Sequence, residues 1–446
     1  MIKVVKFGGS SVANSEQFKK VKKIIDSDVS RKFIVTSACG KESNEDYKIT
    51  DLLYLCEAHV RYGVSYDDIF EKIEQKYYRI KNDLGLDIDL QKEFDMIHDH
   101  IRHGISTDYL VSRGEYLTAK CLAEYLGVPF VDAAEVICFH YDGKIDMEHS
   151  EEKLLEKCRD HERVVIPGFY GVLPNGVIKV MSRGGSDITG SVIANLVDAD
   201  VYENWTDVSG FLVADPRIIK NPLRIPRITY NELREMSYMG ANVLHDDAVF
   251  PVRSKNIPIN IRNTNDPDNP GTMIMNDCSE ADSMEPPHYV TGITGRKDYT
   301  VITLTKSHSS TEVGFLRRLL SVFEEYRISV ESVPCTVDTF SVIVQSKAVE
   351  NCVYEIMGRL KKELEPDELK IEEHLALVAI VGRGMRSVPG MSGKLLSEFG
   401  RHSINLKTIN QSSDELSIVV GVDNRDFENA IRCIYDRFIA EEKKAV

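Results

Sequence analysis

The chain opens with Ile2-Lys3-Val4-Val5-Lys6-Phe7-Gly8-Gly9-Ser10-Ser11, an apolar segment that ends in two glycines. Residues 2–7 predict a short buried strand, and apolar residues at 18, 21, 24 and 25 then recur at helical spacing. A glycine turn between a strand and a helix lets backbone N–H groups approach an anion. Lys6 precedes this turn, where its ammonium could reach a phosphate. Taken alone, such a turn is commonly only a turn.

Two more polar, glycine-containing turns follow predicted strands. One is Ser182-Arg183-Gly184-Gly185-Ser186-Asp187; the other is Trp205-Thr206-Asp207-Val208-Ser209-Gly210, with Asp215-Pro216-Arg217 after it. At the carboxyl edge of a parallel sheet the three turns would meet, and α/β proteins bind ligands at that edge. Arg183 offers a planar fork for a carboxylate or phosphate, and Asp187 could orient a lysine ammonium. Each turn alone is equally explained as a cap, a turn or a surface loop.

Strands alternate with helices up to about residue 285. Segments 33–36, 128–131, 164–166 and 177–181 predict buried strands, and 109–126 predicts a helix closed by Gly127. This order is typical of an α/β sandwich with a mainly parallel sheet. Residues 277–287 are polar, acidic and end in two prolines, so they predict a linker.

An internal repeat follows the linker. Leu319, Phe323 and Ile328 recur as Leu395, Phe399 and Ile404, at an offset of 76 residues (395 − 319). The same offset relates the predicted strands 301–305 and 377–381, and 340–344 and 416–420. Each copy predicts strand, helix, strand, strand, helix, the order of a ferredoxin-like α+β unit. We therefore expect a domain over 1–285 and two small domains over 298–374 and 375–446, with 288–297 contributing a strand.

Together these motifs resemble the aspartokinase family. The resemblance rests on residues 6–12, 183–187, 205–208 and 215–217, on Gly240-Ala241 before Val243-Leu244-His245, and on the repeat, which resembles paired ACT domains. It covers nearly the whole chain, and other amino-acid kinases share the opening turn but not this ending. It implies an amino-acid-kinase fold and transfer of the γ-phosphoryl group of MgATP to the β-carboxylate of L-aspartate. The product would be β-aspartyl phosphate, formed in the first step of lysine, threonine and methionine biosynthesis.

The resemblance also implies roles for single residues. Lys6 would stabilise the transferring phosphoryl group and Asp187 would position Lys6. Aspartate would be held by Thr50, Glu115, Arg183 and Ser186, with Glu115 on its ammonium and Arg183 on its α-carboxylate. The nucleotide would be bound by Lys6, Gly8, Gly9, Ser10, Thr206, Asp207, Leu212, Arg217, Asn242 and Val243. Asn242 and Leu212 stand where the family often has a lysine and a tyrosine, so a cation and a ring are lost there.

The repeat implies feedback control by an amino acid. The segments Gly314, Phe315, Leu316 and Ser329, Val330, Glu331 resemble the lysine-binding segments of lysine-sensitive aspartokinases. Glu331 replaces an aspartate and keeps an anion for the effector's ammonium. Lysine is the expected effector, with threonine a weaker candidate, and pairing of ACT domains across chains implies a homodimer or homotetramer. The same segments have an equally simple structural explanation: Phe315 and Leu316 could begin a core helix, and Ser329, Val330 and Glu331 could form a strand.

Composition excludes several classes of protein. The 446 residues carry 55 basic and 70 acidic side chains, a net charge of −15 that argues against nucleic-acid binding. No apolar run approaches the length of a membrane span. Nine scattered cysteines without a Cys-x-x-Cys pair indicate free thiols in a reducing cytoplasm. His98, His100 and His103 fit a solvated helix face better than a metal site.

Two other functions stay open. Another amino-acid kinase, for glutamate or acetylglutamate, would share the opening turn, although the repeat disfavours it. An amino-acid sensor with an inactive kinase domain would explain Asn242, although Lys6, Glu115, Arg183 and Asp187 oppose it. The glycine-rich segment 381–387 imitates a dinucleotide-binding turn, but it lies within the second repeat.

Overall fold

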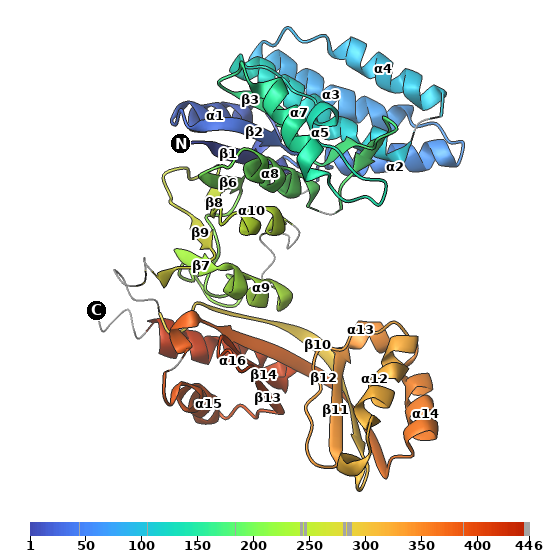
Figure 1. Cartoon of the computed structure of the whole chain (residues 1–446), viewed down its shortest axis with the longest axis vertical. Coiled ribbons are helices and arrows are strands. Elements are labelled where there is room, and N and C mark those ends of the chain that lie inside the picture. Colours follow the sequence, from blue (N-terminus) through green and yellow to red (C-terminus); the bar gives the residue numbers. More distant parts are fainter. Residues whose placement is uncertain are drawn as a thin grey trace. The chain divides into compact units, whose positions relative to one another are not determined.

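A computed structural model of the chain describes residues 1–43, 45–104, 106–182, 184–240, 244, 248–279, 282, 288–386 and 388–440. The chain divides into two compact units (Figure 1). The first comprises Met1–Phe211, Arg224–Asn231 and Asn242–Cys278, and the second comprises Leu212–Leu223, Glu232–Ala241 and Ser279–Val446. No helix in the described part of the chain is long and apolar enough to cross a membrane.

The first unit is built on a mainly parallel sheet. Among the described residues it has seven strands in the order β3-β2-β1-β6-β8-β9-β7. They are β1 (Lys3–Phe7), β2 (Arg31–Thr36), β3 (Val164–Pro167), β6 (Val201–Thr206), β7 (Arg227–Thr229), β8 (Ile259–Asn263) and β9 (Thr272–Met275). Neighbouring strands are parallel except for the antiparallel pair β8–β9. The predicted α/β class with a mainly parallel sheet is confirmed.

Helices cover both faces of this sheet. One apolar core joins its strands to α1 (Ser15–Asp26), α2 (Ile49–Arg61), α3 (Asp67–Leu84), α4 (Leu90–Arg102) and α5 (Thr107–Leu126). On the other face α8 (Gly185–Leu196) packs against β1, β2 and β6 and contacts α7 (Met147–Cys158) and α10 (Phe250–Ser254). The short helix α6 (Ala133–Val136) contacts the strand β4 (Tyr170–Val172). As expected, Gly127 ends α5 in the left-handed conformation, with φ 69°.

Two expected strands lie outside this sheet. Residues 128–131 form no strand and make only a bridge from Phe130 to Val165. Residues 177–181 contain β5 (Ile178–Val180), which pairs with β4 (Tyr170–Val172) in a separate two-stranded antiparallel sheet. Both segments are short apolar runs, a pattern that does not distinguish a central strand from a partly buried hairpin.

The second unit contains an antiparallel sheet in the order β11-β10-β12-β14-β13. Its strands are β10 (Gly292–Thr305), β11 (Thr339–Gln345), β12 (Glu368–Val381), β13 (Thr408–Gln411) and β14 (Ser417–Asp423). Its helices include α12 (Phe315–Glu325), α13 (Ser346–Val349), α14 (Val353–Leu364), α15 (Met391–Arg401) and α16 (Phe427–Tyr435), while α9 (Tyr230–Tyr238) ends in this unit. Residues related by the repeat are buried alike: Leu319, Leu395, Phe323 and Phe399 are all fully buried.

Strands β10 and β12 are shared by the two repeats. Each is 14 residues long, and they pair along most of their length. Gly292–Arg296 pairs with Leu377–Val381 at one end, and Val301–Thr305 pairs with Glu368–Glu372 at the other. β11 pairs with the Tyr299–Thr305 end of β10, and β14 pairs with the Leu375–Val381 end of β12. The two repeats therefore form one continuous sheet.

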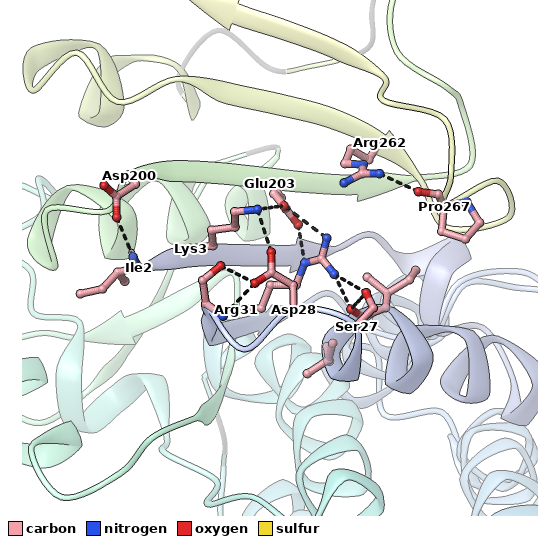
Figure 2. Close-up of polar contacts among 12 residues, drawn as sticks. Ile2, Lys3, Ser27, Asp28, Arg31, Asp200, Glu203, Arg262 and Pro267 are labelled. Carbon is pink, nitrogen blue, oxygen red and sulfur yellow. Dashed lines mark hydrogen bonds and ion pairs between the residues drawn. The ribbon is translucent and has the colours of Figure 1, made fainter.

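A buried charged cluster ties β6 to β2 and β1 in the first unit (Figure 2). Glu203 is 1% exposed and accepts hydrogen bonds from Arg31 Nε at 2.8 Å and Trp205 Nε1 at 2.9 Å. Lys3 Nζ lies 3.3 Å from Glu203 and 2.8 Å from Asp28. Burial opposes ionisation of Asp28, but hydrogen bonds led by that from Lys3 hold its pKa well below the usual range. The cluster fixes the strand that leads to Thr206 and Asp207.

Candidate active site

A cavity of about 840 Å³ opens at the carboxyl ends of β1, β2 and β6, three neighbouring parallel strands. The turns after these strands line it, together with the start of α8 and residues of α2 and α5. Of the predicted site residues, those that line it are Lys6, Gly8, Gly9, Ser10, Thr50, Glu115, Ser186, Asp187, Thr206 and Asp207. The structure thus gathers residues from both expected subsites at the edge where parallel α/β sheets bind ligands.

The turns after β1 and β2 meet backbone to backbone. Gly40 N–H donates to Gly9 O at 2.9 Å. A Cβ added at Gly40 would lie 2.5 Å from the Gly9 carbonyl carbon, so this approach requires glycine. A Cβ at Gly8 would lie 3.5 Å from Lys6 Nζ. The Lys6 ammonium therefore lies at the cavity wall beside the glycine turn.

Lys6 and Asp187 form an ion pair at the centre of the cavity. Lys6 Nζ lies 2.5 Å from Asp187 Oδ1, and their side chains are 8% and 19% exposed. Lys6 reaches Asp187 because alternate residues of β1 point to the face that α8 covers, while Phe7 points to the opposite core. The predicted ordering of Lys6 by Asp187 has the geometry it requires.

Glu115 supplies a buried carboxyl group to the same cavity from the middle of α5. It is 4% exposed, and among the described residues Oε2 has no hydrogen-bond partner. Burial raises the pKa of Glu115 to about 8, against smaller opposing effects of the Ala38 backbone N–H and Lys6. A buried carboxyl with one oxygen left unpartnered suits a ligand that brings its own cation, since a buried charge is costly unless it is paired.

The N-terminus of α8 also faces the cavity. Gly184, at φ 82°, turns the chain into the helix, and Ser186 and Asp187 lie in its first turn. The unpaired N–H groups of such a turn favour an anion. Thr50 lies at the start of α2. Thr206 ends β6 and Asp207 follows it, and Thr206 Oγ1 donates to Asp207 Oδ1 at 3.1 Å. The cavity therefore combines anion-binding backbone with a cation and a buried carboxyl.

Other predicted residues are not placed in this cavity. Arg183, Asn242 and Val243 lie outside the described residues. Leu212 and Arg217 belong to the second unit, and Arg217 Nη2 pairs with Asp215 Oδ2 at 2.5 Å. The Asp215 carboxylate also accepts from the Arg217 backbone N–H at 2.8 Å, as in a side-chain-stabilised turn.

Sequence reasoning missed much of the loop between β2 and α2. Ser37–Lys41, Lys48, Asp51 and Tyr54 also line the cavity, as do Phe169 and Met181. The sequence does contain a signal, because a further turn, with Gly40, follows β2, the strand that neighbours β1. Buried Lys76 on α3 holds this loop by donating to Gly40 O at 2.6 Å and Asp46 Oδ2 at 2.8 Å, and no local pattern in the sequence predicts that contact.

The residues expected to bind an effector lie in the second unit. Gly314 begins α12 at φ 80°, Phe315 is buried in the core beside Phe340, and Leu316 is exposed. Ser329, Val330 and Glu331 run beside β11, where the Glu331 N–H donates to Ile343 O at 2.9 Å and Glu331 Oε1 accepts from Gln345 at 3.2 Å. Burial and a hydrogen bond with Glu331 raise the pKa of Tyr238 to about 12.

Comparison with known proteins agrees with this architecture. The model of the amino acid kinase family matches residues 1–263, and an ACT domain model matches residues 378–438. Aspartokinase 3 of Bacillus subtilis is 34% identical, over 98% of this chain and 99% of its own. A crystal structure of Clostridium acetobutylicum aspartate kinase is 48% identical with a TM-score of 0.91, covering 98% of this chain and 99% of that one.

Escherichia coli aspartokinase III, in a crystal structure with lysine and aspartate, shares the fold. It has a TM-score of 0.75 at 24% identity and covers 98% of this chain and 99% of its own. The family model matches more than half of the chain, and the Bacillus subtilis relative is similar along nearly all of it. The cavity that contains Lys6, Asp187 and Glu115 agrees with both findings. The chain belongs to the aspartokinase family and is an ATP-dependent kinase.

Proposed function

We propose that the chain transfers the γ-phosphoryl group of ATP to the β-carboxylate of L-aspartate, giving β-aspartyl phosphate. The observation that carries the proposal is the cavity shared by the Lys6–Asp187 ion pair and the Glu115 carboxyl, whose Oε2 has no hydrogen-bond partner among the described residues. Glu115 would bind the ammonium of aspartate, and Thr50 and Ser186 would bind beside it. Arg183 would hold the α-carboxylate.

The chemistry requires positioning more than proton transfer. A carboxylate with a pKa near 4 is already ionised at pH 7, so the acceptor needs no general base. The difficulty is to bring two anions together in line and to stabilise the charge that develops on the phosphoryl oxygens. Lys6, the glycine turns and the N-terminus of α8 line the cavity and would supply that stabilisation. The nucleotide would lie along Gly8, Gly9, Ser10, Thr206 and Asp207.

Mg²⁺ enters the proposal as part of the nucleotide substrate. Nucleotide-bound Mg²⁺ takes one or two protein carboxylates together with phosphate oxygens and water. The described residues contain no cluster of three or more His, Cys, Asp or Glu side chains that could hold a metal alone. Asp207 could supply one such carboxylate to nucleotide-bound Mg²⁺, because it lines the cavity. Its carboxylate also accepts a hydrogen bond from Thr206. Mg²⁺ would offset the charge of the β- and γ-phosphates.

The second unit would be the regulator. The proposed domains are a kinase domain over 1–285, a first ACT domain over 298–374 and a second over 375–446, to which 288–297 adds a strand. Lysine would bind at Gly314, Phe315, Leu316, Ser329, Val330 and Glu331 in a homodimer or homotetramer and inhibit the kinase. Phe315 is buried, so it would contribute its backbone. The related Clostridium acetobutylicum enzyme is described as allosteric, which supports regulation but not the choice of lysine.

One assay separates the open functions. The enzyme is incubated with ATP, Mg²⁺ and hydroxylamine, and a panel of amino acids is tested one at a time for hydroxamate. Hydroxamate from L-aspartate but not from glutamate or acetylglutamate is expected. Hydroxamate from one of the other acids would indicate a different amino-acid kinase. No hydroxamate from any acid, with amino-acid binding retained, would indicate a sensor.

A further inference from the structure

We propose that Asn204 is a positioning residue for phosphoryl transfer, because its side-chain amide fixes the carboxylate that holds the Lys6 ammonium. The inference deepens the proposed function and rests on it. Asn204 lies on β6 just before Trp205 and belongs to none of the sequence motifs that predict the site. Its side chain acts through Asp187 and not on the substrate, since Asn204 is not among the described residues that line the cavity.

Two donors converge on one oxygen of Asp187. Asn204 Nδ2 donates to Asp187 Oδ1 at 2.8 Å, and Lys6 Nζ lies 2.5 Å from the same oxygen. Lys6 and Asn204 are register partners on the parallel strands β1 and β6, so both side chains point to the face covered by α8. The Tyr202 hydroxyl on the same face donates to the Asp187 backbone carbonyl at 3.1 Å. β6 therefore holds Asp187 at its side chain and at its backbone.

The Asn204 amide matters because the flexible Lys6 side chain does not fix the position of its own ammonium group. A lysine ammonium ends a flexible four-carbon stem, and its position is set by the acceptor it contacts. Asn204 is 4% exposed, so its hydrogen bond is shielded from water. Without this bond, the Asp187 carboxylate can rotate and carry Lys6 with it. A displacement of about 1 Å in a positioning group can lower a rate by about 100-fold.

Contacts of Glu203 and Trp205, the two neighbours of Asn204 on β6, fix the strand without involving the Asn204 side chain. Trp205 Nε1 donates to Glu203. Glu203 also accepts from Arg31 in the charged cluster (Figure 2). Arg262 also stacks on the Trp205 ring, with its Cζ 4.6 Å from the ring centroid. A substitution at 204 therefore removes the amide hydrogen bond while these contacts keep the backbone in place.

The first test is N204L, which keeps the side-chain shape and removes the amide. We expect kcat with MgATP and aspartate to fall about 10- to 100-fold, the effect of losing one hydrogen bond to a charged group. The KM for aspartate should change less than about twofold, because the amide acts on the phosphoryl-transfer step. The matched control is N195L: Asn195 is also a buried asparagine, but it donates to Pro251 O at 2.7 Å, away from Asp187. It should keep the wild-type kcat.

The second test is N204D, which distinguishes positioning from a structural role. Position 204 faces Asp187 on α8, Lys6 on β1 and Tyr202 on β6, and its register partner on β8 is Ile261. At pH 8 the introduced carboxylate cannot donate to Asp187 and repels it. Near pH 6 the protonated acid can donate as the amide does, since burial and the neighbouring anion favour that form. The ratio of variant to wild-type kcat should therefore rise as the pH falls.

The outcomes of these tests distinguish the role of Asn204 from the proposed kinase activity on which it rests. A wild-type kcat in N204L, or a kcat ratio for N204D that is constant from pH 6 to 8, would overturn the role of Asn204 while leaving the kinase assignment intact. Failure of the wild-type enzyme itself to phosphorylate aspartate would instead overturn the proposed function. Thermal unfolding of each variant shows whether the folded fraction is equal in every comparison.

Discussion

Glu115 combines deep burial with a role that requires charge, and this combination predicts a pH dependence. Its pKa of about 8 means that the carboxyl of the free cavity is largely protonated at pH 7. Binding the ammonium of aspartate requires the ionised form, so binding releases a proton and becomes tighter as pH rises toward 8. The KM for aspartate should therefore fall, by at most about tenfold per pH unit, between pH 6 and 8.

The matched variant for this prediction is Glu115→Gln, which cannot ionise. Its KM for aspartate should exceed that of the wild type at pH 8 and be flat with pH. Steady-state kinetics at constant ionic strength measure both. An equal slope in the wild type and the variant would show that another group carries the dependence.

Among single residues, the sequence predicts those that belong to a turn. The cavity is lined by residues in or next to glycine-rich turns that the sequence identifies: Lys6, Gly8, Gly9 and Asp187. Asn204 and Lys76 could not be predicted in the same way. Asn204 reaches Asp187 only through the register of β1 and β6 and the packing of α8, and Lys76 reaches Gly40 across separate elements. Such contacts depend on tertiary structure, which no local spacing encodes.

At the scale of elements, the charged cluster beneath β6 predicts a large stability effect. Arg31→Met leaves the buried Glu203 carboxylate without its guanidinium partner. We expect the free energy of unfolding to fall by about 3–5 kcal/mol, the usual cost of breaking a buried ion pair from one side. Urea unfolding can be followed by the fluorescence of Trp205, the single tryptophan of the chain.

Two controls define this stability effect. Arg31→Met combined with Glu203→Met should recover part of the lost stability, because the buried carboxylate that lost its Arg31 partner is then removed as well. Lys19→Met breaks the exposed pair with Glu16 and should change stability little. If Arg31→Met were as mild as Lys19→Met, the cluster would contribute nothing to the stability of the unit.

At the scale of the whole molecule, the 76-residue repeat predicts the second unit well. Positions such as Leu319 and Leu395 are equally buried, and β11 and β14 fall where the offset places them. The expected second strand of the first copy is not formed: the counterpart of β13 makes only isolated bridges, at Ser332 and Cys335. The repeat does not reveal that β10 and β12 run through both copies, because the pairing of Gly292–Arg296 with Leu377–Val381 joins segments far apart in sequence. Nor does it reveal that residues 212–223 and 232–241 belong to the second unit.

Control by lysine is the prediction that belongs to the whole molecule. If lysine binds at Glu331, Glu331→Ala should raise the lysine concentration for half-inhibition at least about tenfold, since it removes a charged partner. Glu324→Ala, an exposed carboxylate on α12, should leave that concentration unchanged. Inhibition curves of the wild type and both variants measure this. Full activity of the wild type in millimolar lysine would remove lysine as the effector.

The most direct test of the central claim is trapping of β-aspartyl phosphate by hydroxylamine in the wild type and in Lys6→Ala, side by side. The wild type should form aspartyl hydroxamate from ATP, Mg²⁺ and L-aspartate. Lys6→Ala should form it about 100- to 1,000-fold more slowly while still binding aspartate, because the lost ammonium stabilises the transferring phosphoryl group. Near-normal turnover in Lys6→Ala, or no hydroxamate from the wild type, would contradict the account.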